Sequence, residues 1–291
     1  MNPDAAVVAA ARGQVDVVAG LPFAKIAKAE KAGLQVQSRV SNHPIRMAFN
    51  REGLFRAREM RHALAYAIDR EKLAQVVYQA GANVADTGFF QAGQFWTTTA
   101  SLPTYAPDAA QATALLEALG WTRRDGRWLH QDAPVTLRLL ARKPFKKLAL
   151  ALADQLEAFG LGVDVRVLGR AEEQNALKKR DFDLALLSTS SQGDPGSFAR
   201  RVVGPSWKSD RFSEHADMNA LMAQQAREMD RNKRRAIFEE VQAIYAAELP
   251  AYMLVNKMRS VAHNARIKPV FYEDGIAFGI PVSLHKDMFL R

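Results

Sequence analysis

The sequence contains no cysteine, which excludes disulfide bonds, thiolate metal sites and a cysteine nucleophile. This absence fits an oxidising and a reducing compartment equally well, so composition leaves the compartment open. Long apolar runs are also missing, because no segment approaches the ~18 apolar residues that a membrane-spanning helix needs. Residues 1–18 lack the basic start and the unbroken apolar run of a signal peptide. As written, the sequence therefore predicts a soluble, untargeted chain.

The motifs of common catalytic and cofactor sites are missing as well. The six histidines are scattered, and none forms the H-x-x-x-H or H-E-x-x-H pair that places two imidazoles on one helix face. The hydroxyl-rich stretch STSSQG at 188–193 contains no G-x-S-x-G elbow, and neither a P-loop nor a G-x-G-x-x-G loop occurs. The sequence thus predicts no catalytic residue, no metal site and no cofactor, with a metal site assembled by the fold as the alternative.

The chain does have an excess of positive charge, with 40 Lys+Arg against 31 Asp+Glu and a net charge of +9. Three clusters stand out: RKPFKK at 142–147, KKR at 178–180 and RNKRR at 231–235. Each falls at an expected helix end or turn and lacks the interleaved aromatic residues of a base-stacking surface. We therefore expect solvated helix ends and no nucleic-acid partner, with a phosphate-binding surface as the alternative.

A pair of helices is predicted across RHALAYAIDREKL at 61–73. Asp69 is expected to cap the second helix with its carboxylate, and Gly81 to end that helix. Apolar residues recur at helical spacing on both sides of Asp69: Met60, Leu64, Ala67 and Ile68 before it, and Leu73, Val76, Val77 and Ala80 after it.

Alternating strand and helix patterns predict a sheet that is at least partly parallel. Its strands are expected at 135–141, 163–168 and 182–188, joined by helices at 145–159 and 171–179. Further strands are expected at 14–20, at 34–40 and, beyond Asn42-His43-Pro44, at 45–50. Asp125-Gly126 is expected to form the tight turn of a hairpin. The 291 residues, 48% of them hydrophobic, suffice for one large domain or two smaller ones.

Two loops carry aromatic residues. The first, TGFFQAGQFW at 87–96, would line an apolar pocket with Phe89 and Phe90, and packing of these rings into a core is an equally good interpretation. The second, at 188–213, is too long for a simple connector, and its Phe198 and Trp207 argue against disorder.

In order and spacing, several stretches resemble the C-terminal part of the family 5 extracellular solute-binding proteins, the peptide- and nickel-type receptors of ABC importers. The stretches are MAFN at 47–50, RHALAYAIDREKL, PDAAQATALLEALGW at 107–121, LADQLEAFGLGVDVRV at 152–167, RDFDLALL at 180–187 with Gly193-Asp194-Pro195, and RRAIFEEVQAIYAAELPAYML at 234–254. Each is weak alone, whereas together they span nearly the whole chain.

The resemblance implies an α/β fold, namely a periplasmic-binding-protein-like lobe with a mixed, partly parallel sheet flanked by helices, plus the remnant of a second lobe. Residues 1–44 would be the remnant of the first lobe, 45–264 the second, ligand-binding lobe, and 265–291 a tail that returns to the first lobe. We accordingly expect residues 1–40 to pair with this tail, and the strand near 15–19 to lie outside the sheet that holds 135–140 and 182–187.

The resemblance also bears on the ligand site. Peptide-binding members present an aromatic residue and an aspartate ahead of an Asp-Pro or Glu-Pro pair, and this aspartate holds the amino terminus of the ligand. Pro195 matches that pair, but Ser188 replaces the aromatic residue and Ser191 replaces the aspartate. A peptide-amine clamp is therefore not expected, and Asp194 is interpreted as a cap of the following turn. The candidate ligand-binding residues are Phe89, Phe90, Ser188, Ser191, Asp194, Phe198 and Trp207.

One further departure concerns the helix predicted from Pro107. Where many family members have Asp-Pro, this chain has Ala106-Pro107, which predicts the loss of an N-cap carboxylate worth ~1 kcal/mol.

By resemblance, the chain is expected to be the solute-binding component of an ABC importer, a periplasmic monomer and not an enzyme. The expected ligand is a small solute such as a peptide, an opine, a sugar or a metal chelate, enclosed by hinge closure. The expected partners are the membrane subunits of the importer. A ligand-sensing module of a transcriptional regulator, built on the same fold, is the alternative, because the net charge and the absent signal peptide suit it.

Overall fold

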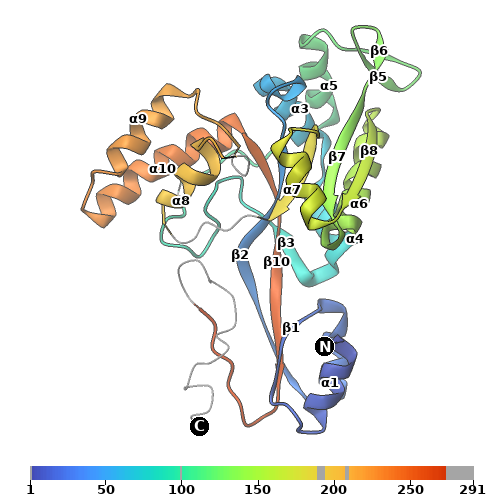
Figure 1. Ribbon diagram of the computed structural model, residues 1–291, viewed down its shortest axis with the longest axis vertical. Coiled ribbons are helices and arrows are strands. Elements are labelled where there is room, and N and C mark those ends of the chain that lie inside the picture. Colours follow the sequence, from blue (N-terminus) through green and yellow to red (C-terminus); the bar gives the residue numbers. More distant parts are fainter. Residues whose placement is uncertain (1, 99, 189–193, 207–209, 273–291) are drawn as a thin grey trace.

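The computed structural model describes residues 2–98, 100–188, 194–206 and 210–272 (Figure 1). Its largest element is a seven-stranded sheet with the strand order β1-β10-β2-β9-β7-β8, in which β3 also pairs with β10. These strands are β1 (Val17–Leu21), β2 (Gln35–Phe49), β3 (Ala82–Val84), β7 (Thr136–Arg142), β8 (Gly162–Leu168), β9 (Leu184–Ser188) and β10 (Ala251–His263). A small separate sheet contains β4 (Thr122–Arg124), β5 (Arg127–His130) and β6 (Ala133–Pro134).

The helices form groups on the two sides of the long strands β2 and β10 (Figure 1). On one side lie α3 (Arg58–Ala67), α4 (Arg70–Tyr78), α5 (Ala109–Ala118), α6 (Lys146–Phe159) and α7 (Arg170–Lys178). On the other side lie α8 (Gly196–Phe198), α9 (Ala216–Gln225) and α10 (Arg231–Glu248). Helices α1 (Pro3–Ala11) and α2 (Ile26–Lys31) pack with β1 at the far end of the long strands.

The predicted strand–helix–strand unit is confirmed. Strand β7 pairs in parallel with β8 from Thr136↔Gly162 to Arg142↔Leu168, and in parallel with β9. The connecting helix α6 buries Leu148, Leu152 and Leu156 in the main hydrophobic core. Gly160 ends α6 at φ 105°, and a Cβ there would lie 2.4 Å from the carbonyl oxygen of Gly126, so only glycine fits. Asp125 and Gly126, at φ 50° and 79°, form the predicted hairpin turn between β4 and β5.

The region around His43 differs from the prediction of two strands. Strand β2 runs without a break through Asn42-His43-Pro44 and pairs antiparallel with β10 from Ala48↔Ala251 to Gln35↔His263. The pairing shifts register between Met253 and Val255 and between Asn256 and Met258. These irregularities accommodate Pro44, which has no N–H to give to a regular ladder.

The expectation that the strand near 15–19 would lie outside the sheet of β7 and β9 is wrong. Strand β1 pairs with residues 260–263 of β10, and β10 leads through β2 to β9 and β7. Because β2 and β10 are 15 and 13 residues long, one hydrogen-bonded sheet joins both ends of the molecule. Beyond β10, Asn264 donates its backbone N–H to the Asp16 carbonyl, and Arg266 donates to the Asp16 carboxylate at 2.8 Å. The division of the chain at residues 44 and 264 stays a prediction.

The helix pair α3–α4 forms as predicted up to its last turn. The Asp69 carboxylate accepts the backbone N–H of Lys72 at 2.8 Å, which confirms the N-cap. Helix α4 ends at Tyr78, however, and Gln79 rather than Gly81 has a positive φ, of 55°. Gly81 serves packing instead, because a Cβ at this position would lie 2.7 Å from the Cβ of Phe23. The predicted helix end at Gly81 is therefore wrong by three residues.

Helix α5 keeps the carboxylate cap that the sequence predicted to be lost. Asp108 is its N-cap residue and accepts the backbone N–H of Gln111 at 2.9 Å. The cap lies one residue beyond Pro107 rather than one before it, so the expected loss of ~1 kcal/mol does not arise.

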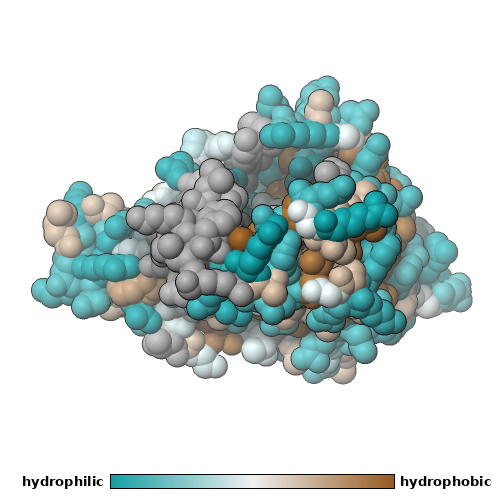
Figure 2. Space-filling view, turned by 90° about the horizontal axis from the view of Figure 1, so that it is seen from below, coloured by the Kyte–Doolittle hydropathy of each residue, from teal (hydrophilic) through white to brown (hydrophobic). Residues whose placement is uncertain are grey.

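The surface seen along the long axis, from the end that carries α1, is mainly hydrophilic, with apolar residues showing between polar ones (Figure 2). No helix within the described residues combines the length and the hydropathy that crossing a membrane requires.

Candidate ligand site

The parallel strands β7, β8 and β9 end at one edge of the sheet. In open α/β sheets, ligands bind in the crevice beyond the carboxyl ends of parallel strands. Ser188, the last residue of β9, is exposed at this edge and lies opposite Ile45 of β2. Of the seven candidate residues, Ser188 thus occupies the position that the general rule favours.

Charged residues that sequence reasoning did not select lie at the same carboxyl edge. Arg142, the last residue of β7, places its Nε 3.3 Å from Oε1 of Glu173, whose side chain is 7% exposed. Burial raises the pKa of the Glu173 carboxyl, and the charge of Arg142 opposes that rise. The signal in the sequence was a charged residue directly after a buried strand, at the start of the cluster RKPFKK.

Lys257 lies on the sheet near the ring of Phe145. Its Nζ is 5.5 Å from the centre of that ring and 5.1 Å from the centre of the Tyr78 ring. Burial lowers the pKa of the Lys257 ammonium. The guanidinium carbon of Arg142 also lies 5.4 Å from the centre of the Phe145 ring. The carboxyl edge therefore combines two cations with a buried aromatic ring.

The aromatic candidates Phe89, Phe90 and Phe198 come together in one ring cluster. The Phe198 ring lies 5.2 Å from that of Phe89 and 5.3 Å from that of Phe238, and Phe89 lies 5.4 Å from Phe90, all in edge-to-face geometry. All three candidates are at most 2% exposed. They belong to the hydrophobic cluster beneath α8, α9 and α10, and Phe90 alone among them also borders the cavity described next.

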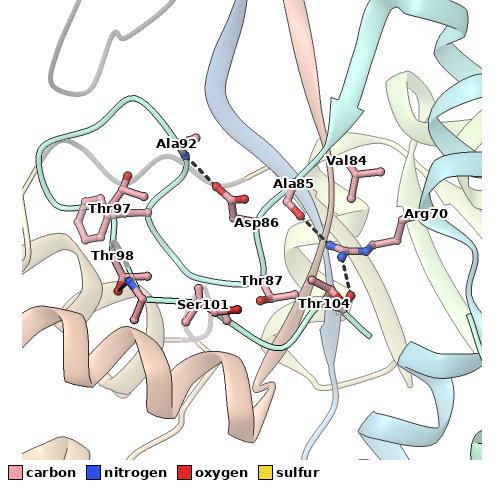
Figure 3. A pocket seen from close by; sticks show the side chains of 13 residues that line it. Arg70, Val84, Ala85, Asp86, Thr87, Ala92, Thr97, Thr98, Ser101 and Thr104 are labelled. Carbon is pink, nitrogen blue, oxygen red and sulfur yellow. Dashed lines mark hydrogen bonds between the residues drawn. The ribbon is translucent and has the colours of Figure 1, made fainter. Parts of the chain in front are cut away.

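A cavity of about 460 Å³ is lined largely by the loop that joins β3 to α5 (Figure 3). Most of its polar lining already holds the loop together: the Asp86 carboxylate accepts the N–H of Ala92 at 2.9 Å, and the Thr87 hydroxyl donates to the Pro103 carbonyl at 2.7 Å. The lining residues are Arg70, Val84, Ala85, Asp86, Thr87, Phe90, Ala92, Thr97, Thr98, Ala100, Ser101, Leu102 and Thr104. Such a polar, preformed hollow suits the side chain or a polar group of a small ligand.

Arg70, the last residue of the A-I-D-R motif, fixes this loop to the sheet. Its guanidinium donates to the carbonyls of Ala85 at 2.7 Å and Thr104 at 2.8 Å (Figure 3). It also donates to the carbonyl of Met253 at 2.8 Å. Burial lowers the pKa of Arg70, and the guanidinium also stacks over the Tyr252 ring at 4.7 Å. The motif therefore anchors a wall of the cavity through backbone hydrogen bonds.

Asp194 caps a turn, as the sequence predicted. Its Oδ1 accepts the N–H of Gly196 at 2.6 Å, its carbonyl accepts the Ser197 N–H, and its Oδ2 lies 3.4 Å from Nη1 of Arg234. Ser191 and Trp207 lie outside the described residues. Within the described part of the chain, no group of three or more His, Asp or Glu side chains is arranged to hold a metal ion.

Comparison with known proteins shows the family to which this chain belongs. The family model described as bacterial extracellular solute-binding proteins, family 5 Middle, matches residues 1–210. The peptide transport periplasmic protein SapA of Salmonella typhimurium is 28% identical over 220 residues, which cover 72% of this chain and 38% of that protein. Di/tripeptide-binding protein 1 of Pseudomonas aeruginosa is 23% identical over 233 residues, or 74% of this chain and 42% of its own length.

Solved structures also share the fold, among them the following two. The oligopeptide-binding protein AppA from Bacillus subtilis, in complex with a nonapeptide, has a TM-score of 0.79 and 18% identity, covering 93% of this chain and 56% of AppA. NikA from Brucella suis, in complex with Fe(III)-EDTA, has a TM-score of 0.81 and 18% identity, covering 96% of this chain and 59% of NikA. The chain thus spans less than two thirds of the length of each of these proteins. Since the family model covers most of the chain, the protein belongs to the family 5 bacterial extracellular solute-binding proteins.

Proposed function

We propose that this chain is the second lobe, with part of the first, of a periplasmic receptor that delivers a small solute to the membrane subunits of an ABC importer. The family to which it belongs comprises binding proteins rather than enzymes. The relatives named above are transport and binding proteins, and they give the regulator alternative no support.

The observation that carries the proposal is the irregular pairing of β2 with β10. The two register shifts fall at residues 253–258, where the long strands leave the lobe and continue toward β1. Bulges bend strands and interrupt the hydrogen bonds between them. A bend in the two strands that connect the lobes can therefore act as the hinge about which one lobe rotates. The carboxyl edge with Ser188 and the loop cavity would then form one wall of the closing cleft.

A matched pair of substitutions tests whether this edge contacts solute. Ser188→Arg places a long, charged side chain at the carboxyl edge, where it would block contact between the solute and the protein. Solute affinity is expected to fall by at least about tenfold, which corresponds to about 1.4 kcal/mol of binding free energy. Ser213→Arg, at another exposed serine, is the control and should leave affinity unchanged. Equal affinities of both variants would contradict the placement of the site.

Hinge closure is testable because the chain has no cysteine, so introduced cysteines take fluorophores specifically. Val8→Cys on α1 and Ala171→Cys on α7 replace exposed residues on helices that pack against β1 and β7, respectively. Energy transfer between them should change on adding trialanine, N-acetyl-trialanine or the nickel complex of L-histidine. The pair Thr122→Cys and Ala171→Cys, within one lobe, should not respond. The proposal fails if no probe changes the first pair, or if both pairs change equally.

The solute class follows from Ser191. A buried ammonium without a carboxylate partner costs about 3–5 kcal/mol, more than a hundredfold in affinity. Since Ser191 offers a hydroxyl where the resemblance places an aspartate, we propose a solute that does not depend on a free peptide amine, such as a modified peptide, an opine, a sugar or a metal chelate. Calorimetry with trialanine and N-acetyl-trialanine decides this point, and a strong preference for the free amine would show the inference to be wrong.

A further inference from the structure

Another cavity, of about 330 Å³, lies at the opposite edge of the sheet from Ser188. Three segments form it: the residues that follow the end of β2, the residues just before β9, and residues 210–214. Strand β9 runs from Leu184 to Ser188, so about 13 Å of extended chain separates the two edges. The cavity is lined by Arg51, Glu52, Arg56, Arg180, Asp210, Arg211 and Glu214.

Two of these arginines are largely buried, and each has an Nε without a hydrogen-bond acceptor among the residues that the structure describes. The side chains of Arg51 and Arg180 are 10% and 11% exposed. Arg51 forms an ion pair with Glu214 and stacks over the Phe212 ring at 4.5 Å, while Nε of Arg180 lies 3.6 Å from a carboxylate oxygen of Glu52. Within the described chain, Nε of neither arginine has a hydrogen-bond acceptor. Unmet donors of this kind are costly and call for an acceptor from outside the chain.

Positive charge also exceeds negative charge in this cavity. Asp210 is engaged with Arg46 in a buried ion pair. The remaining lining residues are four arginines and the two glutamates Glu52 and Glu214, whose side chains are 58% and 57% exposed. Burial lowers the pKa of Arg180, and the charge of Arg211 lowers it further. Burial likewise lowers the pKa of Arg51. An anion in the cavity would relieve both effects.

The backbone of Arg180 and Arg211 adopts a conformation that few residues with a side chain favour. Both have positive φ, of 55° and 50°. Residues other than glycine rarely adopt this conformation, and asparagine is the side-chain-bearing residue that tolerates it best. Arg180 directly follows Lys179, the C-cap of α7, where glycine is the usual choice. The backbone conformation of these two arginines is therefore unfavourable, and both side chains line the same cavity.

We propose that this cavity binds the oxyanion of a phosphate group, with Arg51 and Arg180 as inner donors and Arg56 and Arg211 at the rim. Guanidinium groups bind phosphate through paired, charge-assisted hydrogen bonds, and Arg51 and Arg180 are the lining residues whose Nε atoms have no acceptor in the described chain. The phosphate would join the end of β2, the start of β9 and the segment 210–214. This site is independent of the solute cleft, since it occupies the other edge of the sheet.

Thermal unfolding and calorimetry with inorganic phosphate and with glycerol 3-phosphate test the proposal, at an ionic strength held constant with sodium chloride. Both anions are expected to raise the unfolding temperature saturably, beyond the effect of chloride. Tighter binding of inorganic phosphate would identify the free ion as the ligand, and tighter binding of glycerol 3-phosphate would identify a phosphate ester.

The decisive variant is Arg180→Asn, because asparagine suits the positive φ and the protein should fold. Its affinity for either anion should fall at least about tenfold, as loss of a charge-assisted hydrogen bond implies. Arg124→Asn, at an exposed arginine of β4, should bind like the wild type, and so should Ser188→Arg. No anion-specific stabilisation of the wild type, or full affinity in Arg180→Asn, would overturn the proposal.

Discussion

Two pairs of buried arginines in this protein differ in what their guanidinium groups contact. Arg61 and Arg70, at the two ends of the motif R-x-A-x-x-x-A-I-D-R, are 2% and 8% exposed. Arg61 donates five hydrogen bonds to the carbonyls of Phe55, Arg56, Glu248 and Leu249, and Arg70 donates three. Arg51 and Arg180 are nearly as buried, yet each has an Nε without an acceptor in the described chain.

The contrast separates a structural from a binding role for the same side chain. A buried charge costs several kcal/mol unless hydrogen bonds and counter-charges compensate it. Backbone carbonyls provide that compensation for Arg61 and Arg70, which therefore join elements distant in sequence. For Arg51 and Arg180 the compensation is incomplete, and both border a cavity that can admit an anion. Burial alone would have assigned all four arginines the same role.

The largest effect is expected for Arg61→Met. Methionine keeps most of the volume but leaves four carbonyls without donors, so the free energy of unfolding should fall by about 3–5 kcal/mol. Urea unfolding followed by circular dichroism measures this change. Arg58→Met is the control, because Arg58 is 50% exposed and its ion pair with Glu248 should contribute under about 1 kcal/mol. Similar losses in both variants would break the distinction between anchoring and surface arginines.

A smaller effect is expected for Arg70→Met. Three carbonyls lose a donor, which should lower the free energy of unfolding by about 2–3 kcal/mol. Two of these carbonyls, those of Ala85 and Thr104, belong to the loop around the cavity. Limited proteolysis should therefore cut residues 85–104 faster than in the wild type. Unchanged protection of this loop would argue against its attachment through Arg70.

Arg51→Met should have the smallest effect of the three arginine substitutions when phosphate is absent. The variant loses one ring contact and an ion pair whose carboxylate, that of Glu214, is 57% exposed, and it also removes an unmet donor, so a change of about 1 kcal/mol or less is expected. In saturating phosphate, the difference from the wild type should grow because only the wild type gains binding energy. A loss as large as that of Arg61→Met would place Arg51 among the structural arginines.

Local sequence patterns predicted those features that neighbouring residues determine. Asp69 caps α4, and Asp125-Gly126 turns the hairpin, because each depends on a few adjacent backbone groups. The parallel unit of β7, α6 and β8 was predictable because the spacing of apolar residues changes from a strand pattern to a helix pattern and back. The pairing of β7 with β8 agrees with these local patterns. The family resemblance, based on the order of such patterns, then indicated the fold.

Pairing across long distances accounts for the features that the sequence did not predict. Asn42-His43-Pro44 is a breaker signal, yet β10, some 210 residues away, holds this stretch in one strand. The rings of Phe89 and Phe198 were compatible with a pocket or a core, and their contacts with Phe238 place them in a buried cluster. Arg142 and Glu173 meet only because two parallel strands end side by side.

The weakest effect concerns His62, which lies beside Arg61 but can lose its charge. Its Nε2 is 2.7 Å from the Ala247 carbonyl oxygen and 3.2 Å from the Tyr105 hydroxyl. The pKa of His62 is lowered, chiefly by burial and also by the charges of Arg58 and Arg61. The hydrogen bond to Ala247 and the charge of Glu248 act in the opposite direction. The folded protein therefore binds fewer protons at this site than the unfolded chain below about pH 6.5.

Stability should accordingly fall as the pH decreases from about 7 through the folded-state pKa of His62, because protons then favour the unfolded chain. His62→Gln is neutral throughout and can still donate to Ala247, so its stability relative to the wild type should rise as the pH falls. Urea unfolding at about pH 7, 6 and 5 measures the difference. Adding Arg58→Gln to both proteins should reduce this pH dependence, since one repelling charge is gone. A constant difference between wild type and His62→Gln at all three pH values would show that His62 does not sense the neighbouring arginines.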